Sequence, residues 1–202
     1  GDEVPVDIDV DVERDDDPRL IGVTLDLTDF ASVAAAAKSI EEAVGAPYGL
    51  VHNAGLGPTG MVEETPMSVW EQTFATNIFG PVALTKALLP PMRKAGRGRI
   101  VLVSSAAGIR GMPVAATYSA VKGALERWGE SMAGEVASFG IGVTILVAGA
   151  YDTEIVRNPT AGNAQVDGVL EQKWTQTVRL QPAGPAAAEL HDHWTITVNG
   201  QD

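Results

Sequence analysis

Short apolar runs rich in β-branched residues alternate with longer segments of helical periodicity from residue 20 onward. This alternation constrains the fold most strongly, because it is the order expected when helices cover a parallel sheet. The runs at 100–103 (IVLV) and 143–147 (VTILV) are apolar at nearly every position, so we expect strands buried between two helical layers. The sequence therefore predicts an α/β fold with a parallel sheet and helices on both faces.

The expected elements follow one another closely along the chain. Strands are expected at residues 20–25, 50–51, 99–104, 142–147 and 194–198. Helices are expected from residue 28 or 29 to 44, over 68–92 with Pro66 at the start and a break near Gly80 and Pro81, and over 118–139. The stretch 154–190 is the least regular and carries several glycines and prolines, so we expect it to form a lid that covers the substrate site.

Composition limits the class of protein. The 202 residues, 45% of them apolar, suffice for one core, so we expect residues 1–202 to form a single domain. The absence of cysteine excludes disulfides and thiolate chemistry and favours a reducing compartment, so we expect a cytoplasmic protein. The formal net charge of -12 argues against nucleic acid or an anionic membrane as a partner, and we expect neither a signal peptide nor a membrane-spanning helix.

The acidic charge is concentrated in residues 1–17, which hold nine carboxylates against Arg14 alone. Apolar residues alternate with polar ones there, at Val4, Val6, Ile8, Val10 and Val12. This period of two fits a half-exposed strand, whereas the charge fits a solvated acidic tail, and both interpretations stay open. A calcium loop that opens at Asp7 is disfavoured, because Val12 stands where the sharp-turn glycine belongs.

A group of polar side chains falls at positions suited to catalysis. Tyr118 and Lys122 are four residues apart in a predicted helix, so their side chains leave the same face. Ser105 ends a predicted buried strand, and the carboxyl ends of strands in an open parallel sheet point at the ligand crevice. Asn77 lies inside a predicted helix, and Asn53-Ala54-Gly55 closes an earlier strand. Each residue alone has an ordinary structural interpretation, and their joint occurrence favours a site.

These residues together resemble the short-chain dehydrogenase/reductase family. The matching pieces are Asp26 in LDLTD, Asn53-Ala54-Gly55, Asn77 in ATNIFGP, Ser105 in VLVSSAAG, Tyr118 to Lys122 in YSAVK, and the segment from Val147 to Thr153. The resemblance covers residues 20–153 and implies a Rossmann-like, doubly wound parallel sheet whose N-terminal strands are missing from this sequence. It also implies an NAD(P)-dependent oxidoreductase that interconverts an alcohol and a ketone or aldehyde by hydride transfer.

The resemblance also implies roles for particular residues. The catalytic residues would be Asn77, Ser105, Tyr118 and Lys122. The cofactor, NAD or NADP, would be bound by Asp26, Leu27, Asn53, Ala54, Gly55, Tyr118, Lys122, Gly149 and Thr153. The implied partners are a small-molecule alcohol or carbonyl substrate and further copies of the chain in a homodimer or homotetramer. The competing hypothesis is a non-catalytic relative or incomplete fragment that serves assembly or binding.

The chemistry of these residue types fits the implied roles. A phenol has an ordinary pKa of about 10, so a general acid or base needs a lowered value, which the Lys122 ammonium one helical turn from Tyr118 would favour. Ser105 can donate a hydrogen bond to the substrate oxygen where charge develops. In the family, the residue that matches Asn77 interrupts its helix to hold a water beside the lysine, which gives a proton path.

The sequence departs from the family pattern at two places. The glycine-rich phosphate turn is not found before residue 20, and a Gly-x-Gly-x-x-Gly string at Gly55, Gly57 and Gly60 follows the wrong strand, so we do not expect it to bind phosphate. Ala148-Gly149 stands where the family has Pro-Gly, which predicts a looser turn. The gap left by two missing central strands would be filled by further residues of the real protein, by the segment 4–12, or by strands from a partner.

Three other patterns have plain structural interpretations. His191 and His193 lack a nearby third ligand and are expected to be solvated rather than metal-bound. A basic cluster is expected to be the solvated end of a helix, at Arg93, Lys94, Arg97 and Arg99. An apolar stripe on the long helix is expected to be core, at Val121, Leu125, Trp128, Met132 and Val136, although in the family the same helix also pairs subunits.

Overall fold

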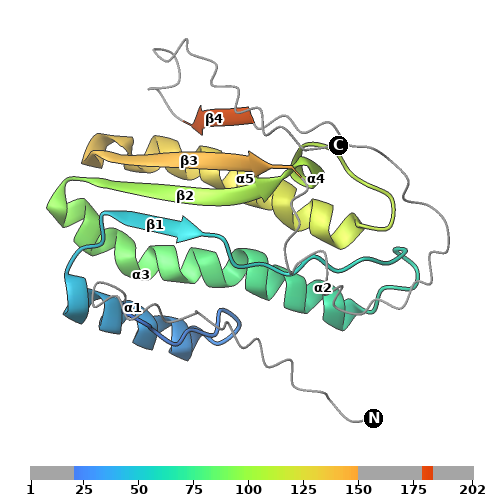
Figure 1. Ribbon diagram of the computed structural model, residues 1–202, viewed down its shortest axis with the longest axis horizontal. Coiled ribbons are helices and arrows are strands. Elements are labelled where there is room, and N and C mark those ends of the chain that lie inside the picture. The colour runs from blue at the N-terminus through green and yellow to red at the C-terminus, as the bar shows by residue number, and fades with distance from the viewer. Residues whose placement is uncertain (1–20, 150–178, 184–202) are drawn as a thin grey trace, which may run out of the picture.

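The computed structural model describes residues 21–149 and 179–183, with a four-stranded sheet at its centre in the order β1-β2-β3-β4 (Figure 1). The strands are β1 (Gly49–His52), β2 (Gly98–Ser105), β3 (Ile141–Ala148) and β4 (Arg179–Ala183). The first three run parallel, whereas β4 pairs antiparallel with β3. Parallel strands flanked by helices confirm the predicted α/β class.

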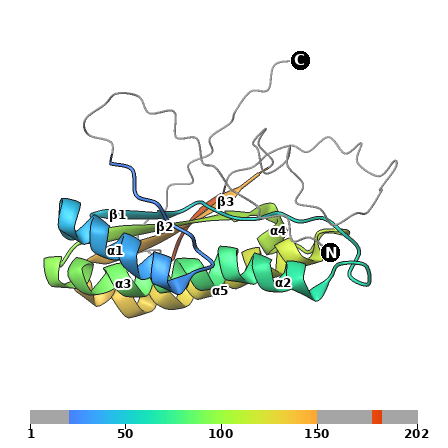
Figure 2. The ribbon, with the colours of Figure 1, turned by 90° about the horizontal axis from the view of Figure 1, so that it is seen from below.

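One helix precedes β1, and the others lie between β1 and β2 or between β2 and β3. They are α1 (Phe30–Val44), α2 (Met67–Phe74), the π-helical turn η1 (Ala75–Phe79), α3 (Gly80–Ala95), α4 (Ala106–Ile109), α5 (Ala116–Val136) and the 3₁₀ turn η2 (Ala137–Phe139). Helices α3 and α5 lie along the same side of the sheet, and α1 packs beside α3 (Figure 2). The helices between parallel strands return the chain to the amino end of the sheet, as parallel pairing requires.

The core lies between the sheet and helices α3 and α5. Alternate residues of β2 and β3 are buried, and Ile100 and Leu102 are fully enclosed. The stripe predicted on α5 belongs to this core, which confirms that prediction. Its members are Val121, Leu125, Trp128, Met132 and Val136, of which Trp128 alone is partly exposed. Burial of this stripe fixes the rotation of α5, and therefore fixes which side chains of the helix face β2.

Local sequence explains where the helices begin. The Asp29 side chain accepts a hydrogen bond from the Ala31 backbone N–H at 2.8 Å, so Asp29 caps α1 as predicted. Pro66 directly precedes α2, also as predicted. The break expected near Gly80 is a widening of the helix to the π-helical turn η1 rather than an interruption. The missing N–H of Pro81 falls next to this wider turn, where the ordinary helical hydrogen bonding has already changed.

Two expectations differ from the structure. Residues 21–25 are irregular rather than a strand, and Ile21 is 59% exposed. A strand needs a hydrogen-bonded neighbour, and β1, at the edge of the described sheet, pairs with β2 alone. Strand β4 lies inside the stretch 154–190 that we predicted to be irregular. The remaining predictions, for 194–198, for 4–12, for His191 and His193, and for the rest of the lid, concern residues outside the described ranges.

Two kinds of feature are missing from the part of the chain that the structure describes. Within it, no helix combines the length and the apolar character needed to cross a bilayer. The same residues contain no cluster of three or more histidine, aspartate or glutamate side chains that could hold a metal ion. The polar residues at one edge of the sheet are therefore the candidates for a functional site.

Candidate active site

The carboxyl ends of the parallel strands bring the predicted site residues to one edge of the sheet. Ser105 is the last residue of β2 and pairs in register with the end of β3, so Gly149 follows β3 beside it. Asn53 and Ala54 follow β1 and are exposed, whereas Gly55 is half-buried. Thr153 lies outside the described residues. The edge thus joins three segments that are far apart in the sequence.

Tyr118 and Lys122 extend from α5 toward the end of β2. Lys122 is 5% exposed, and its Nζ donates to the Val103 backbone oxygen at 2.7 Å. The same nitrogen lies over the Tyr118 ring, 5.6 Å from its centre. The Ser105 hydroxyl is the polar group next to the Tyr118 phenol. A hydroxyl, a phenol and an ammonium therefore meet at this point, as the helical spacing and the strand end suggested.

Burial dominates the protonation of this pair. It raises the pKa of Tyr118 above its ordinary 10.0, while the neighbouring Ser105 hydroxyl lowers that pKa by a smaller amount. Burial also lowers the pKa of Lys122 to about 8. We expected the Lys122 ammonium to bring the pKa of Tyr118 below its ordinary value; the pKa is raised instead, because burial outweighs the neighbouring groups. The ammonium is held by its hydrogen bond to the Val103 oxygen, with Nζ over the Tyr118 ring.

Asn77 holds the loop that follows β1. It lies in the π-helical turn η1 and is 3% exposed. Its Oδ1 accepts from the Leu56 N–H at 2.8 Å, and its Nδ2 donates to the Leu56 oxygen at 2.9 Å. The helix departs from regular geometry at this residue, and such π-helical turns are frequent at functional sites. The side-chain amide is engaged by both backbone groups of Leu56, so it fixes the loop containing Gly55.

The Asp26–Leu27 turn packs next to η1. The Asp26 carboxylate accepts hydrogen bonds from the Thr28 hydroxyl at 2.7 Å and the Thr28 N–H at 2.8 Å, which lower the pKa of Asp26. Leu27 lies so close to Gly80 that a β-carbon at Gly80 would collide with the Leu27 carbonyl oxygen. Because Gly80 directly follows η1, glycine at this position lets the turn approach the segment that carries Asn77.

Two loops meet just before α5. The Gly60 N–H donates to the Val114 oxygen at 2.7 Å, and Gly60 pairs with Ala115 in an isolated parallel bridge. Val114 has a φ of 57°, a left-handed conformation that is strained for a β-branched residue. These contacts hold the residues that lead into α5, and they therefore fix the start of the helix that carries Tyr118.

Buried partners behind the site were missed by the sequence analysis. Ser104 and Glu126 are both buried, and the Ser104 hydroxyl donates to Glu126 Oε1 at 2.6 Å. Glu126 is four residues after Lys122, so helical spacing places both on one face of α5. That spacing was the available signal. By contrast, the Gly55–Gly60 string lies in a loop and leads into a helix only at Met67, so it is not a helix start, in agreement with the sequence.

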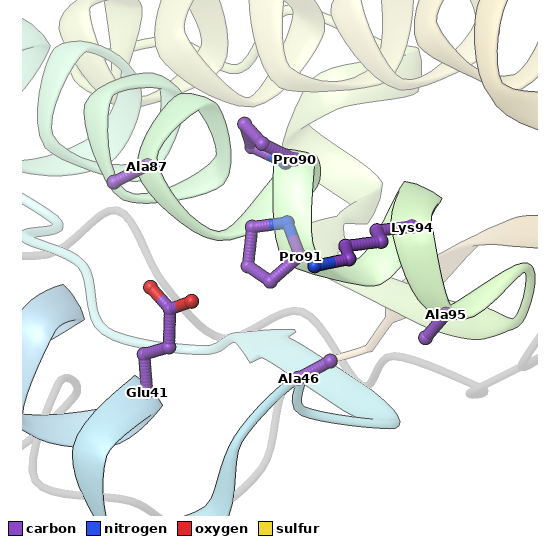
Figure 3. Close-up of a pocket in the computed structure, with 7 residues that line it drawn as sticks. All are labelled: Glu41, Ala46, Ala87, Pro90, Pro91, Lys94 and Ala95. Carbon is purple, nitrogen blue, oxygen red and sulfur yellow. The ribbon is translucent and has the colours of Figure 1, made fainter.

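A separate hollow lies between α1 and α3 (Figure 3). It is lined by Glu41, Ala46, Ala87, Pro90, Pro91, Lys94 and Ala95. Ala46 and Ala95 shortly precede β1 and β2, so the hollow lies at the amino ends of the strands. Ser105 and Asn53 lie at the carboxyl ends. The hollow is therefore on a different part of the surface and contributes nothing to the candidate active site.

Comparison with known proteins agrees with the motifs and the fold. The family model described as short chain dehydrogenase matches residues 10–164. The chain therefore belongs to the short-chain dehydrogenase/reductase family, whose Rossmann-like fold accounts for the parallel strands and their flanking helices. The hydroxyl, phenol and ammonium lie at the carboxyl edge of this sheet, which is the edge where open parallel α/β sheets bind ligands.

Individual relatives differ in what their names say of function. The chain is 37% identical over 150 residues to dehydrogenase/reductase SDR family member 7B of Xenopus laevis, covering 74% of this chain and 46% of the relative. It is 40% identical over 128 residues to inactive 2-(S)-hydroxypropyl-CoM dehydrogenase 2 of Xanthobacter autotrophicus, covering 63% and 56%. A gluconate 5-dehydrogenase from Burkholderia cenocepacia, solved with NADP and tartrate, has a TM-score of 0.63 at 28% identity, covering 70% and 55%. The chain spans about half the length of these relatives.

Proposed function

We propose that this protein is an NAD(P)-dependent oxidoreductase that interconverts a small-molecule alcohol and the corresponding ketone or aldehyde. The observation that supports the proposal best is the meeting of Ser105, Tyr118 and Lys122 at the carboxyl edge of a parallel sheet. These three groups offer a hydrogen-bond donor, a proton donor and a fixed cation to one bound oxygen. Family membership supports the same class of reaction.

Tyr118 acts as the acid in the reducing direction. Its raised pKa keeps the phenol protonated at neutral pH, so it can donate a proton to the carbonyl oxygen as that oxygen gains negative charge. The Ser105 hydroxyl donates a hydrogen bond to the same oxygen. A bound nicotinamide cofactor supplies the hydride that the carbonyl carbon accepts. In the oxidising direction the Tyr118 oxygen takes the proton back from the alcohol.

Lys122 stabilises the phenolate that proton transfer leaves on Tyr118. Its pKa of about 8 keeps most of the ammonium charged at neutral pH. One of its N–H groups is held by the Val103 oxygen. Among the described residues this is its one hydrogen bond, and an ammonium carries three N–H donors, so in this proposal the other two serve a ligand at the sheet edge. Asn77 fixes the β1 loop and thereby one wall of the same site.

The residues at the edge fit a dinucleotide by the chemistry of their donors and acceptors. The exposed Asp26 carboxylate suits an amino group of an adenine, next to Leu27 in the turn that packs on Gly80. The exposed residues Asn53 and Ala54, with the half-buried Gly55, suit ribose hydroxyls through their backbone donors and acceptors. We assign NAD or NADP to Asp26, Leu27, Asn53, Ala54, Gly55, Tyr118, Lys122 and Gly149, with Thr153 as a further contact.

Isotope transfer tests the proposed reaction. The protein is incubated with NADH or NADPH deuterated at the transferable C4 position and with a panel of aliphatic and aromatic ketones and aldehydes. The account predicts an alcohol that carries one deuterium on the former carbonyl carbon, detected by mass spectrometry, with at least one of the two cofactors. Heat-denatured protein is the control. A complete panel with no transfer from either cofactor would overturn the proposal.

The second candidate function is a non-catalytic scaffold. It is favoured by one observation, that a relative 40% identical over 128 residues carries the name of an inactive dehydrogenase. Titration of protein fluorescence with NADH and NADPH separates the two candidates. Saturable binding of either cofactor supports the oxidoreductase, whereas no binding of either supports the scaffold. We further propose that the chain assembles as a homodimer or homotetramer, which sedimentation velocity would test against a monomer.

A further inference from the structure

Side chains on two successive turns of α5 form hydrogen bonds with two successive residues of β2. Lys122 Nζ donates to the Val103 oxygen at 2.7 Å, and one turn later Glu126 Oε1 accepts from the Ser104 hydroxyl at 2.6 Å. Lys122 and Glu126 are each 5% exposed, and Ser104 is 2% exposed. The next residue of β2 is Ser105, so both bonds lie immediately behind the hydroxyl of the candidate site.

We propose that Glu126 is a positioning residue of the active site, which, through Ser104, holds the end of β2 against α5 and so keeps Ser105 and the Val103 oxygen in place for Tyr118 and Lys122. The inference rests on the proposed function for its catalytic meaning. The structural part of the proposal, that the Ser104–Glu126 bond, the tie between β2 and α5, keeps Lys122 buried, can be measured without substrate or cofactor.

The residue type supports positioning over simple packing. A buried carboxylate is costly unless its oxygens are paired, and an apolar side chain would fill the same space at lower cost. Glu126 Oε1 has the short bond to Ser104, while its Oε2 lies 3.8 Å from Arg127, whose side chain is 70% exposed. Arg127 makes its closer contact, 2.8 Å, with Glu130. The strong partner of Glu126 is therefore the strand, and a charge-assisted bond of this length is directional.

The packing around the tie leaves little room for movement. Gly108 of α4 lies so close that a β-carbon there would collide with the Glu126 carboxylate and stand 2.9 Å from the Ser104 hydroxyl oxygen. Strand, short helix and long helix therefore converge on one buried bond. Loss of that bond frees the end of β2 and lets water reach Lys122, whose pKa is lowered by burial.

Few other charges face Lys122 in the described part of the chain. On its own helix the ionisable neighbours are Tyr118 and Glu126. Elements α4, η1 and β3, which pack on α5, contain no ionisable residue. Strand β2 has Arg99 near its opposite end, and α2 has the exposed Glu71. Strand β4 begins at Arg179, which is its one ionisable residue.

The experiment measures the pKa of Lys122 by NMR of protein with ¹³C-labelled lysine, titrated from neutral to alkaline pH. The chain has five lysines, and Lys122→Arg identifies the signal. Ser104→Ala removes the tie at constant charge. Glu126→Gln keeps an acceptor oxygen without the charge, and the Ser104→Ala/Glu126→Gln double variant removes the tie without leaving a buried charge unpaired. Glu130→Gln, on the same helix with its side chain 44% exposed, is the matched control.

In Ser104→Ala, the pKa of Lys122 is expected to rise by about one unit or more from the wild-type value toward its ordinary value. The double variant is expected to show a rise of the same size when it is compared with Glu126→Gln. Glu130→Gln should leave it at the wild-type value, and Ser104→Thr should restore it. A Lys122 pKa that stays at the wild-type value in Ser104→Ala and in the double variant, while both lose thermal stability, would show a purely structural bond and overturn the proposal. Because no turnover is measured, this outcome is separate from failure of the proposed reaction.

Discussion

Gly108 is the position where α4 lies closest to the buried groups of the site. A β-carbon there would collide with the Glu126 carboxylate and would stand 2.9 Å from both the Ser104 hydroxyl oxygen and the Lys122 carbonyl carbon. Carbon atoms in real structures do not remain at such distances, so a larger residue must move α4 away from α5. The absence of a β-carbon at Gly108 therefore allows α4, which follows Ser105, to pack closely against α5.

Gly108→Ala is expected to lower the free energy of unfolding by about 1–3 kcal/mol, the usual cost of overpacking a filled interior. Gly111→Ala is the matched control, since a β-carbon at Gly111 meets no atom within 4 Å. Urea denaturation followed by circular dichroism gives both values. Equal stability of the two variants would show that α4 does not approach α5 as closely as the structure has it.

The cap of α1 is a local feature that the sequence predicts well. Asp29 accepts the hydrogen bond of the Ala31 N–H, and the helix then packs Val33 and Ala37 into the core. Asp29→Ala is expected to reduce the free energy of unfolding by about 1 kcal/mol, because a helix N–H loses its partner. Asp29→Asn, which caps equally well, should retain wild-type stability in the same denaturation experiment. A loss of equal size in both variants would contradict the capping role.

His52 ties β1 to the helices that cover it. Its Nε2 lies 2.8 Å from the Thr85 hydroxyl of α3, and its ring centre lies 5.9 Å from that of Trp128 on α5. Burial lowers the pKa of His52 to about 4, so the ring is neutral in the folded protein at neutral pH. The unfolded chain would protonate the same ring near its ordinary pKa of about 6.5.

Stability is therefore expected to fall on acidification. Between pH 6.5 and about 4 the unfolded state binds a proton at His52 that the folded state does not, so the free energy of unfolding drops as the pH falls, by about 3 kcal/mol over this range. Chemical denaturation at pH 7 and at pH 4 should show a smaller drop for His52→Gln than for wild type. His191 and His193 are common to both proteins and cancel in the comparison. Identical pH dependence would contradict the buried neutral ring.

Sequence reasoning succeeds where a property belongs to one segment. The apolar runs predicted β2 and β3 to within a residue at each end, and the spacing of Tyr118 and Lys122 on one helical face follows from the period of the helix. It fails where a property depends on a distant neighbour. Residues 21–25 have the composition of a strand, but the described sheet offers them no partner.

The same limit applies to the site. The Ser104–Glu126 tie joins residues 22 apart in the chain, and the burial that makes it short is a property of the assembled sheet and helices. The sequence also predicts the wrong direction for the pKa shift of Tyr118. That direction depends on whether burial outweighs the nearby ammonium, and burial is a property of the folded protein. Spacing gives the residues of a site, and packing determines their protonation.

We propose that two segments far apart in the chain form one catalytic centre: Ser105 at the end of β2, and Tyr118 and Lys122 on α5, with Tyr118 as the acid. The most direct measurement is kcat for cofactor-dependent carbonyl reduction by Tyr118→Phe, with Tyr48→Phe as the control, because Tyr48 is 58% exposed. We expect Tyr118→Phe to lose at least about 100-fold in kcat, because its general acid is missing, while its unfolding temperature stays close to wild type and Tyr48→Phe keeps full activity. A Tyr118→Phe variant that turns over at the wild-type rate would contradict it.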